Sequence, residues 1–305
     1  MLDKTVHVTT EHLELREVRC RSQLSGWSPP EEARANAVVF VREGSFRRHV
    51  RGVESVLDPA AAYFSRPGDE QRFEHHGPTG DVCTVVQIGD DLLAAIWGGE
   101  PHLPDGTLFT PPEIDLSHRR LLAAARLTDQ HEVTEQALTL VAALLDDTDP
   151  ARVAAGRPAT LNRQRRLVAA AREAITTDPT IGLVALAGHL AISPHHLSRI
   201  FRAHTDSTVS RYRNRIRVRL ALERLAEGQR DLAALAADLG FADHAHLTRT
   251  VHAELGAPPS HIRDVLAPAH GALVTRSRND LPAERVKTSQ RDAASDAAAP
   301  RTHGL

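Results

Sequence analysis

The chain has 305 residues, of which 41% are hydrophobic and 25% are charged, and this composition argues against a wholly disordered protein. Two cysteines are too few for a disulfide framework, and no apolar run approaches the roughly 20 residues that cross a membrane. Because the N-terminus also lacks the pattern of a secretory signal, we expect a cytoplasmic protein of about two domains without a membrane partner.

The net charge of −2 hides an uneven distribution along the chain. Residues 1–150 carry 14 basic and 25 acidic side chains, a net charge of −11, whereas residues 160–266 carry 15 and 10, a net charge of +5. Five arginines occupy every second position from Arg211 to Arg219. This asymmetry predicts that only the second half of the chain approaches a polyanion.

The first half of the sequence has the pattern of short strands followed by helices. From about Leu13 to Trp97, β-rich runs are separated by Gly and Pro, which predicts a sandwich or barrel. The main runs are Ala37–Val41, Ser55–Leu57, Tyr63–Phe64 and Val82–Ile88. After Pro112 the apolar residues follow helical spacing, for example from Val133 to Leu145, and predict two amphipathic helices that close the domain.

Composition also suggests where the domains begin and end. A β-rich domain with its two closing helices is expected over residues 1–148, and a linker rich in Asp, Pro and Gly over residues 149–160. An all-α domain should follow over residues 161–267, and residues 268–305 have too little apolar surface to fold. The predicted fold class is therefore α+β.

An internal repeat lies within the predicted all-α domain, between Thr180 and Arg263. The run Leu186–Ile192 aligns with Leu235–Phe241 at an offset of 49, and the pattern continues after a one-residue insertion in the turn. Each copy predicts a short helix, a tight turn and a second helix, the arrangement called a helix-turn-helix unit.

The second helix of each copy has a recognisable start and a buried face. Ser193 is expected to cap the first of these helices, with Pro194 as its first residue, and Asp243 is expected to cap the second. Apolar residues four positions apart share one face in each helix: Leu197 with Phe201, and Leu247 with Val251. A connecting helix from about Val209 to Glu227 would be roughly 28 Å long.

At these residues the chain resembles the AraC/XylS family of transcriptional regulators. The resemblance covers Leu183 to Arg263 and rests on Leu186-Ala187, Ser193-Pro194 with Leu197–Phe201, Tyr212, Arg217–Leu225, Ala236 with Asp238–Phe241, and Gly256 with Pro259 and Arg263. It implies a regulator that binds double-stranded promoter DNA through two helix-turn-helix units joined by a long helix, with RNA polymerase as a further partner. It also implies no enzymatic activity.

The resemblance also implies which residues contact DNA. Contacts to base edges are expected from His195, Ser198 and Arg199 in the first unit and from His244, Ala245 and Arg249 in the second. Contacts to phosphates are expected from Arg202, Thr248, His252 and Arg215. The recognition helices would lie near one DNA turn apart, about 34 Å, and enter successive major grooves.

Some residues depart from the family pattern. Ala191 and Asp206 stand where the family usually has glycine, and Asp tolerates a left-handed backbone less well than glycine does. In the second unit Ala245, Leu247 and Val251 are smaller than the usual residues. We expect the fold to tolerate these changes and the first unit to dominate specificity.

The N-terminal half is similar to the cupin-like sensing and dimerisation domains of some family members, through the stretch Phe64–His76 and Gly80–Cys83. A small-molecule effector and a homodimer are therefore expected. His75, His76 and Cys83 are candidate metal ligands, but adjacent histidines on a strand point to opposite faces, so we predict no metal and no cofactor. The strand aromatics are either an effector pocket or core: Phe46, Tyr63, Phe64 and Phe73.

The predicted function is sequence-specific transcriptional regulation controlled by an effector or partner at the N-terminal domain. One alternative is a cupin-type metal-dependent enzyme fused to a DNA-binding module, which would need a facial set of metal ligands. Another is an architectural protein that binds DNA without sequence preference. The effector, the operator, and the choice between activation and repression have no signature in the sequence.

Overall fold

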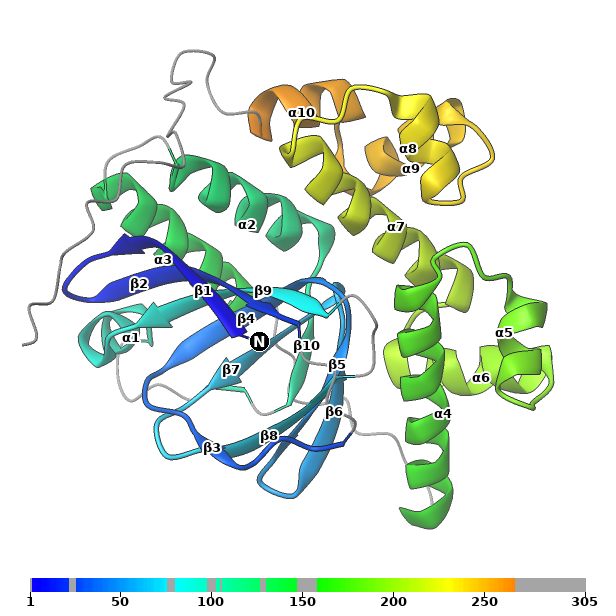
Figure 1. Cartoon of the computed structure of the whole chain (residues 1–305), viewed down its shortest axis with the longest axis horizontal. Coiled ribbons are helices and arrows are strands. Elements are labelled where there is room, and N and C mark those ends of the chain that lie inside the picture. The colour runs from blue at the N-terminus through cyan, green and yellow to red at the C-terminus, as the bar shows by residue number, and fades with distance from the viewer. Residues whose placement is uncertain are drawn as a thin grey trace, which may run out of the picture. The chain divides into compact units, whose positions relative to one another are not determined.

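Two antiparallel sheets form the N-terminal half of the computed structural model, which describes residues 2–21, 26–75, 80–97, 103–104, 106–126, 130–146 and 158–266 (Figure 1). The six-stranded sheet has the order β1-β2-β9-β4-β7-β10, with β1 Leu2–Thr9, β2 Leu13–Cys20, β9 Asp81–Ile88, β4 Ala37–Glu43, β7 Ala61–Ser65 and β10 Thr107–Phe109. The four-stranded sheet has the order β3-β8-β5-β6, with β3 Glu31–Glu32, β8 Glu70–His75, β5 Phe46–Val50 and β6 Val53–Leu57.

Strand β4 is buried on both sides because each face of its sheet is covered. Val38 and Phe40 pack into the core beneath the helices, whereas Val39 and Val41 pack into the core that also includes Phe46 of the four-stranded sheet. Alternate residues of a strand point to opposite faces, so a continuous apolar run is what two covered faces require. The continuous apolar run Ala37–Val41, which predicted this strand, is therefore explained by burial of both of its faces.

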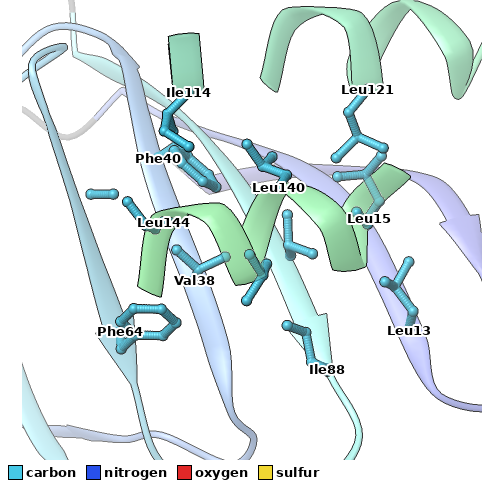
Figure 2. Close-up of a cluster of buried hydrophobic side chains, with 14 of the residues drawn as sticks. Leu13, Leu15, Val38, Phe40, Phe64, Ile88, Ile114, Leu121, Leu140 and Leu144 are labelled. Carbon is cyan, nitrogen blue, oxygen red and sulfur yellow. The ribbon is translucent and has the colours of Figure 1, made fainter. Parts of the chain in front are cut away.

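The helical layer over the six-stranded sheet comes from α2 Pro112–Ala124 and α3 Gln130–Asp146. Leu121 of α2 and Leu140 of α3 are buried against Leu15, Val38 and Phe40 of the sheet (Figure 2). The two predicted closing helices and the β-rich order of this half are confirmed.

Several elements differ from the prediction. Strand β1 lies at the edge of its sheet and is mostly exposed, so it lacks the buried alternation that reveals a strand. Asp90–Trp97, expected within the β-rich run, is the short helix α1, whose first turn carries two acidic residues that favour a helix N-terminus. The helix α4 spans Pro158–Thr177 and begins inside the predicted linker.

The C-terminal half is all-α, as predicted. Its further helices are α5 Leu183–His189, α6 Pro194–Thr205, α7 Val209–Ala226, α8 Leu232–Asp238, α9 His244–Leu255 and α10 Pro259–Leu266. One buried cluster joins α4, α5 and α6 to the start of α7, and another joins α8, α9 and α10 to the end of α7. The long helix α7 therefore belongs to both cores (Figure 1).

The predicted domain boundaries remain predictions. Most of the expected linker, residues 149–157, and the expected disordered tail lie outside the described residues. Met1 to Pro268 form one compact unit, so the two halves pack against each other. No helix in the described ranges has the length and hydropathy to cross a membrane.

Candidate nucleic-acid interface

The first helix-turn-helix unit consists of α5 and α6. The Ser193 hydroxyl accepts a hydrogen bond from the backbone N–H of His196 at 3.2 Å, and Pro194 is the first residue of α6, as predicted. Leu197, Ile200 and Phe201 form the buried face of α6 against α4 and α5. The cap and the buried face together fix which side of α6 faces solvent.

The predicted reading residues of the first unit lie on that solvent side. His195, Arg199 and Arg202 are exposed, and Ser198 is half-buried. The Arg199 guanidinium lies 3.4 Å from Nδ1 of His196, one turn earlier. The described structure thus leaves three donor side chains of α6 accessible to a polyanion.

The second unit consists of α8 and α9 and repeats this geometry. Asp243 caps α9 by accepting from the backbone N–H of His246 at 2.6 Å, and this hydrogen bond holds the pKa of the Asp243 carboxyl below its usual range. Leu247 and Val251 are fully buried, as predicted. Of the predicted contact residues, the exposed ones are His244, Arg249 and His252, and the half-buried ones are Ala245 and Thr248.

The departures from the family pattern stand at left-handed backbone positions. Ala191 and Asp206 both have φ of +53°, in the region that favours glycine. The corresponding positions of the second unit are Gly240 and Gly256, each with φ of +72°. The first unit therefore adopts the turns that the family pattern requires without the residue that adopts them most readily.

The arginines of α7 do not form one basic surface. Arg213 and Arg217 are four residues apart and therefore lie on the same side of α7. Both donate to carbonyl oxygens in the loop before α5, Arg213 to that of Ile181 and Arg217 to that of Pro179. Of the five arginines, only Arg211 is exposed. The clustering in the sequence thus reflects several separate structural contacts of α7.

The second pair, Arg215 and Arg219, faces the N-terminal half. Arg215 donates to the carbonyl oxygen of Thr110 at 3.2 Å, and Arg219 donates to the same residue and pairs with the Asp115 carboxylate. Arg215 would have to leave this contact to reach a phosphate. Its predicted role at DNA stays a prediction.

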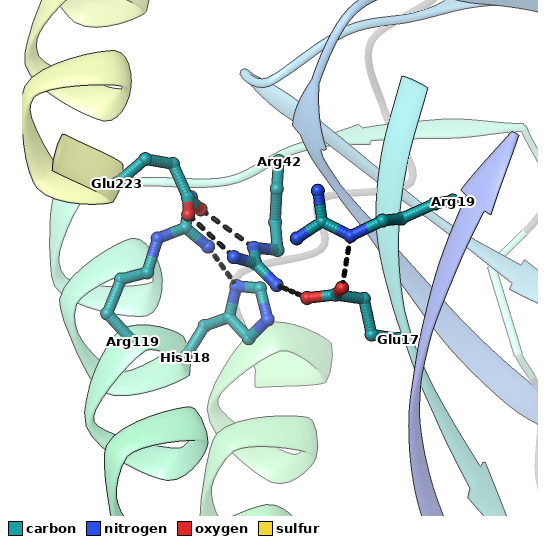
Figure 3. A network of polar contacts seen from close by, with 6 residues as sticks. All are labelled: Glu17, Arg19, Arg42, His118, Arg119 and Glu223. Carbon is teal, nitrogen blue, oxygen red and sulfur yellow. Dashed lines mark hydrogen bonds and ion pairs between the residues drawn. The ribbon is translucent and has the colours of Figure 1, made fainter. Parts of the chain in front are cut away.

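A buried ion-pair network joins α7 to the six-stranded sheet and to α2 (Figure 3). Glu223 of α7 accepts two hydrogen bonds from Arg42 of β4, at 2.8 and 2.7 Å, and pairs with Arg119 of α2 at 2.7 Å. Arg42 also pairs with Glu17 of β2. Burial raises the pKa of the Glu223 carboxyl, but the two arginines outweigh it and hold that pKa below its usual range.

His118 lies beside this network. Its ring stacks on Phe40 at 4.5 Å between centroids, and its Nδ1 lies 3.0 Å from a guanidinium nitrogen of Arg119. Burial lowers the pKa of His118, and the charges of Arg119 and Arg42 lower it further. A neutral imidazole at this position can accept the hydrogen bond that the arginine offers.

A further contact between the halves centres on Asp58, which lies between β6 and β7. Its buried carboxylate accepts from Arg172 of α4 at 2.8 Å and from the Tyr212 hydroxyl of α7. Arg172 also donates to that hydroxyl oxygen at 2.9 Å. Burial raises the pKa of Tyr212, so this phenol stays protonated and donates.

Sequence reasoning did not find these contacts between the halves. Arg42 and Glu223 are 181 residues apart, and the local pattern of neither segment identifies the other as its partner. The sequence did carry one signal, since a charged residue directly after the apolar run of β4 has to be paired if it is buried.

The sequence matches the family described as "Helix-turn-helix domain" over residues 186–264, which contain both units. This match covers about a quarter of the chain and shows that these residues form a helix-turn-helix domain. Helices α6 and α9 are the second helices of the two units. A comparison with curated proteins found no match.

Solved structures similar to this chain cover either most of it or about a third of it. Fatty-acid-bound ToxT from Vibrio cholerae is 11% identical, with 84% of this chain and 96% of that chain covered and a TM-score of 0.33. The C-terminal domain of AraT from Geobacillus stearothermophilus is 22% identical, with 33% and 87% covered and a TM-score of 0.32. An RmlC-like cupin from Shewanella frigidimarina is 21% identical, with 28% and 75% covered and a TM-score of 0.25.

Proposed function

We propose that the protein binds promoter DNA sequence-specifically, with α6 and α9 in successive major grooves. The observation that carries this proposal is that two capped helices, one packed on each end of α7, present an exposed arginine at matching positions, Arg199 and Arg249. Helix α7 has 18 residues and is therefore about 27 Å long, comparable to the roughly 34 Å of one DNA turn.

The predicted residues take distinct roles in this proposal. His195, Ser198 and Arg199 of α6 and His244, Ala245 and Arg249 of α9 read base edges, because arginine can engage guanine with two hydrogen bonds. Arg202, Thr248 and His252 bind phosphates, and Arg215 joins them if it leaves Thr110. Phosphate contacts position the helices without carrying sequence information.

Selection of bound sites from random duplex DNA tests the proposal. A sequence-specific regulator enriches a pattern with two half-sites, each read by one helix. Arg199→Ala or Arg249→Ala should then cost about 1–3 kcal/mol on that pattern and relax preference at one position. If the selection yields no pattern while the protein still binds DNA, the protein is an architectural binder and the proposal fails.

We also propose that the N-terminal half, residues 1–148, senses an effector or partner and forms a homodimer, and that residues 161–267 bind DNA and contact RNA polymerase. The support is the docking of α4 and α7 on the N-terminal half through buried ion pairs at Glu223, Asp58 and Asp115. A ligand that alters these contacts changes the position of both recognition helices. Sedimentation that shows only monomer at micromolar concentration would exclude the dimer.

A further inference from the structure

Three potential metal ligands meet where the two sheets face each other. Cys20 is the last residue of β2 and pairs across the strands with Asp81, the first residue of β9. His75 is the last residue of β8 in the other sheet and lies opposite Phe46 of β5. The three residues come from distant parts of the sequence, which is why Cys20 was absent from the ligands considered above.

The distances among these groups suit a metal ion. Sγ of Cys20 lies 3.6 Å from Nε2 of His75, while the other ring nitrogen, Nδ1, lies 2.6 Å from the Asp81 carboxylate. One donor atom from each of the three residues lies within 4.8 Å of the others. A histidine that binds a metal characteristically donates its second N–H to a carboxylate, and His75 and Asp81 have that arrangement.

The spacing also distinguishes tetrahedral from linear coordination. Zinc lies about 2.3 Å from a thiolate and about 2.0 Å from an imidazole nitrogen, so two such ligands at the tetrahedral angle are about 3.5 Å apart. Two ligands on opposite sides of a linear two-coordinate ion would be about 4.3 Å apart by the same bond lengths. The observed 3.6 Å agrees with the tetrahedral arrangement.

The backbone holds the ligands in place. Gly80, which precedes Asp81, has φ of +77°, and a side chain there would collide with the carbonyl oxygen of Cys20. Gly44 has φ of +73° and packs in the same way against the carbonyl of Gly80. Rigid backbone beneath a site limits the reorganisation that binding requires.

Burial of the site favours a cation. The Asp81 side chain is 5% exposed and the His75 side chain 16% exposed, so the carboxylate needs positive charge or donors near it. The Cys83 thiol contacts its second oxygen at 3.7 Å. A divalent ion bound by Cys20 and His75 would place positive charge near the Asp81 carboxylate. A neutral His75 imidazole does not supply that charge.

We propose that the N-terminal half binds zinc(II) through Sγ of Cys20 and Nε2 of His75, with Asp81 orienting His75. The remaining coordination positions are open to water or to a small ligand. The ion would link the two sheets, because Cys20 belongs to one and His75 to the other. This site goes beyond the proposed control of DNA binding and does not depend on it.

The test titrates zinc into the full chain after chelation, with calorimetry for affinity and cobalt(II) substitution for the ligand set. The expected result is stoichiometric binding and a thiolate-to-cobalt charge-transfer band. Cys20→Ser and His75→Gln should abolish the band and weaken zinc binding by more than the roughly 10–100-fold expected of Asp81→Asn. Cys83→Ser, which removes the other thiol, should retain the band.

A second measurement uses the wild-type chain and does not depend on the folding of any variant. In the wild-type chain, zinc should slow alkylation of Cys20 by iodoacetamide, identified by mass spectrometry, relative to the chelated chain. If the folded chain binds no zinc, if the Cys20→Ser chain keeps the band, or if zinc leaves Cys20 alkylation unchanged, the proposal is wrong. Cys20 would then be a thiol hydrogen-bonded to the imidazole.

Discussion

Replacement of Glu223 by glutamine tests how strongly α7 is held on the N-terminal half. The Glu223 side chain is 3% exposed, and its partners Arg42 and Arg119 are 7% and 4% exposed. Glu223→Gln keeps the size of the side chain but leaves two buried guanidinium groups without their shared anion. Breaking a buried ion pair in this way costs about 3–5 kcal/mol. Glu17 still neutralises Arg42, which favours the lower end of that range.

Urea unfolding and calorimetry measure this loss. Since 1 kcal/mol shifts the Tm of a domain of this size class by about 2–4 °C, the variant should melt roughly 6–20 °C lower. The matched control is Glu227→Gln at the exposed end of the same helix, which should change the free energy of unfolding by at most about 0.5 kcal/mol. Equal shifts in the two variants would refute the reasoning.

A compensating substitution separates loss of the ion pair from general disruption of α7. Arg42→Met removes one of the two cations that lose their ion pair with Glu223 in Glu223→Gln, and an apolar side chain of similar length fits a buried position. The double variant should therefore be more stable than Glu223→Gln alone. Additive losses would mean that the two residues do not interact.

Further predictions concern the DNA-binding units and the dependence on pH. Arg199→Ala should weaken binding to a selected operator more than Arg249→Ala in gel-shift titrations, and the reverse order would show that the second unit dominates. Ser193→Ala should cost about 1 kcal/mol of stability in urea unfolding, because it removes the cap of α6. Burial lowers the pKa of His118 in the folded protein, so the unfolded chain binds a proton first as pH falls. Stability should decline below about pH 6.5 by up to about 1.4 kcal/mol per pH unit, and His118→Phe should remove this component.

The sequence predicted the C-terminal half well because its signals are local. Caps at Ser193 and Asp243 need only the next turn of helix, and the buried pairs Leu197 with Phe201 and Leu247 with Val251 need only helical spacing. The turn positions at Ala191 and Asp206 followed from the family pattern, which has glycine there, even though neither residue is glycine.

The remaining features depend on contacts between distant segments, which local patterns do not record. The edge strand β1 buries too little to show alternation, and its pairing with β2 defines it. Cys20 and His75 meet only once both sheets have formed. The α7 arginines had suggested a basic surface, because net charge does not distinguish a side chain that faces solvent from one that binds a carbonyl.

In the function proposed above, helix α7 connects effector sensing to DNA recognition, because its residues divide between the two tasks. Its two ends pack in the cores of the two units, whereas Glu223, Arg219 and Tyr212 bind the N-terminal half. An effector can shift the protein between two arrangements only if it binds one of them more tightly. The contacts that can differ between two arrangements of α7 on the N-terminal half include Arg42 with Glu223 and Asp58 with Tyr212. A ligand that changed neither contact, nor the Arg219 contact, would leave both recognition helices where they are.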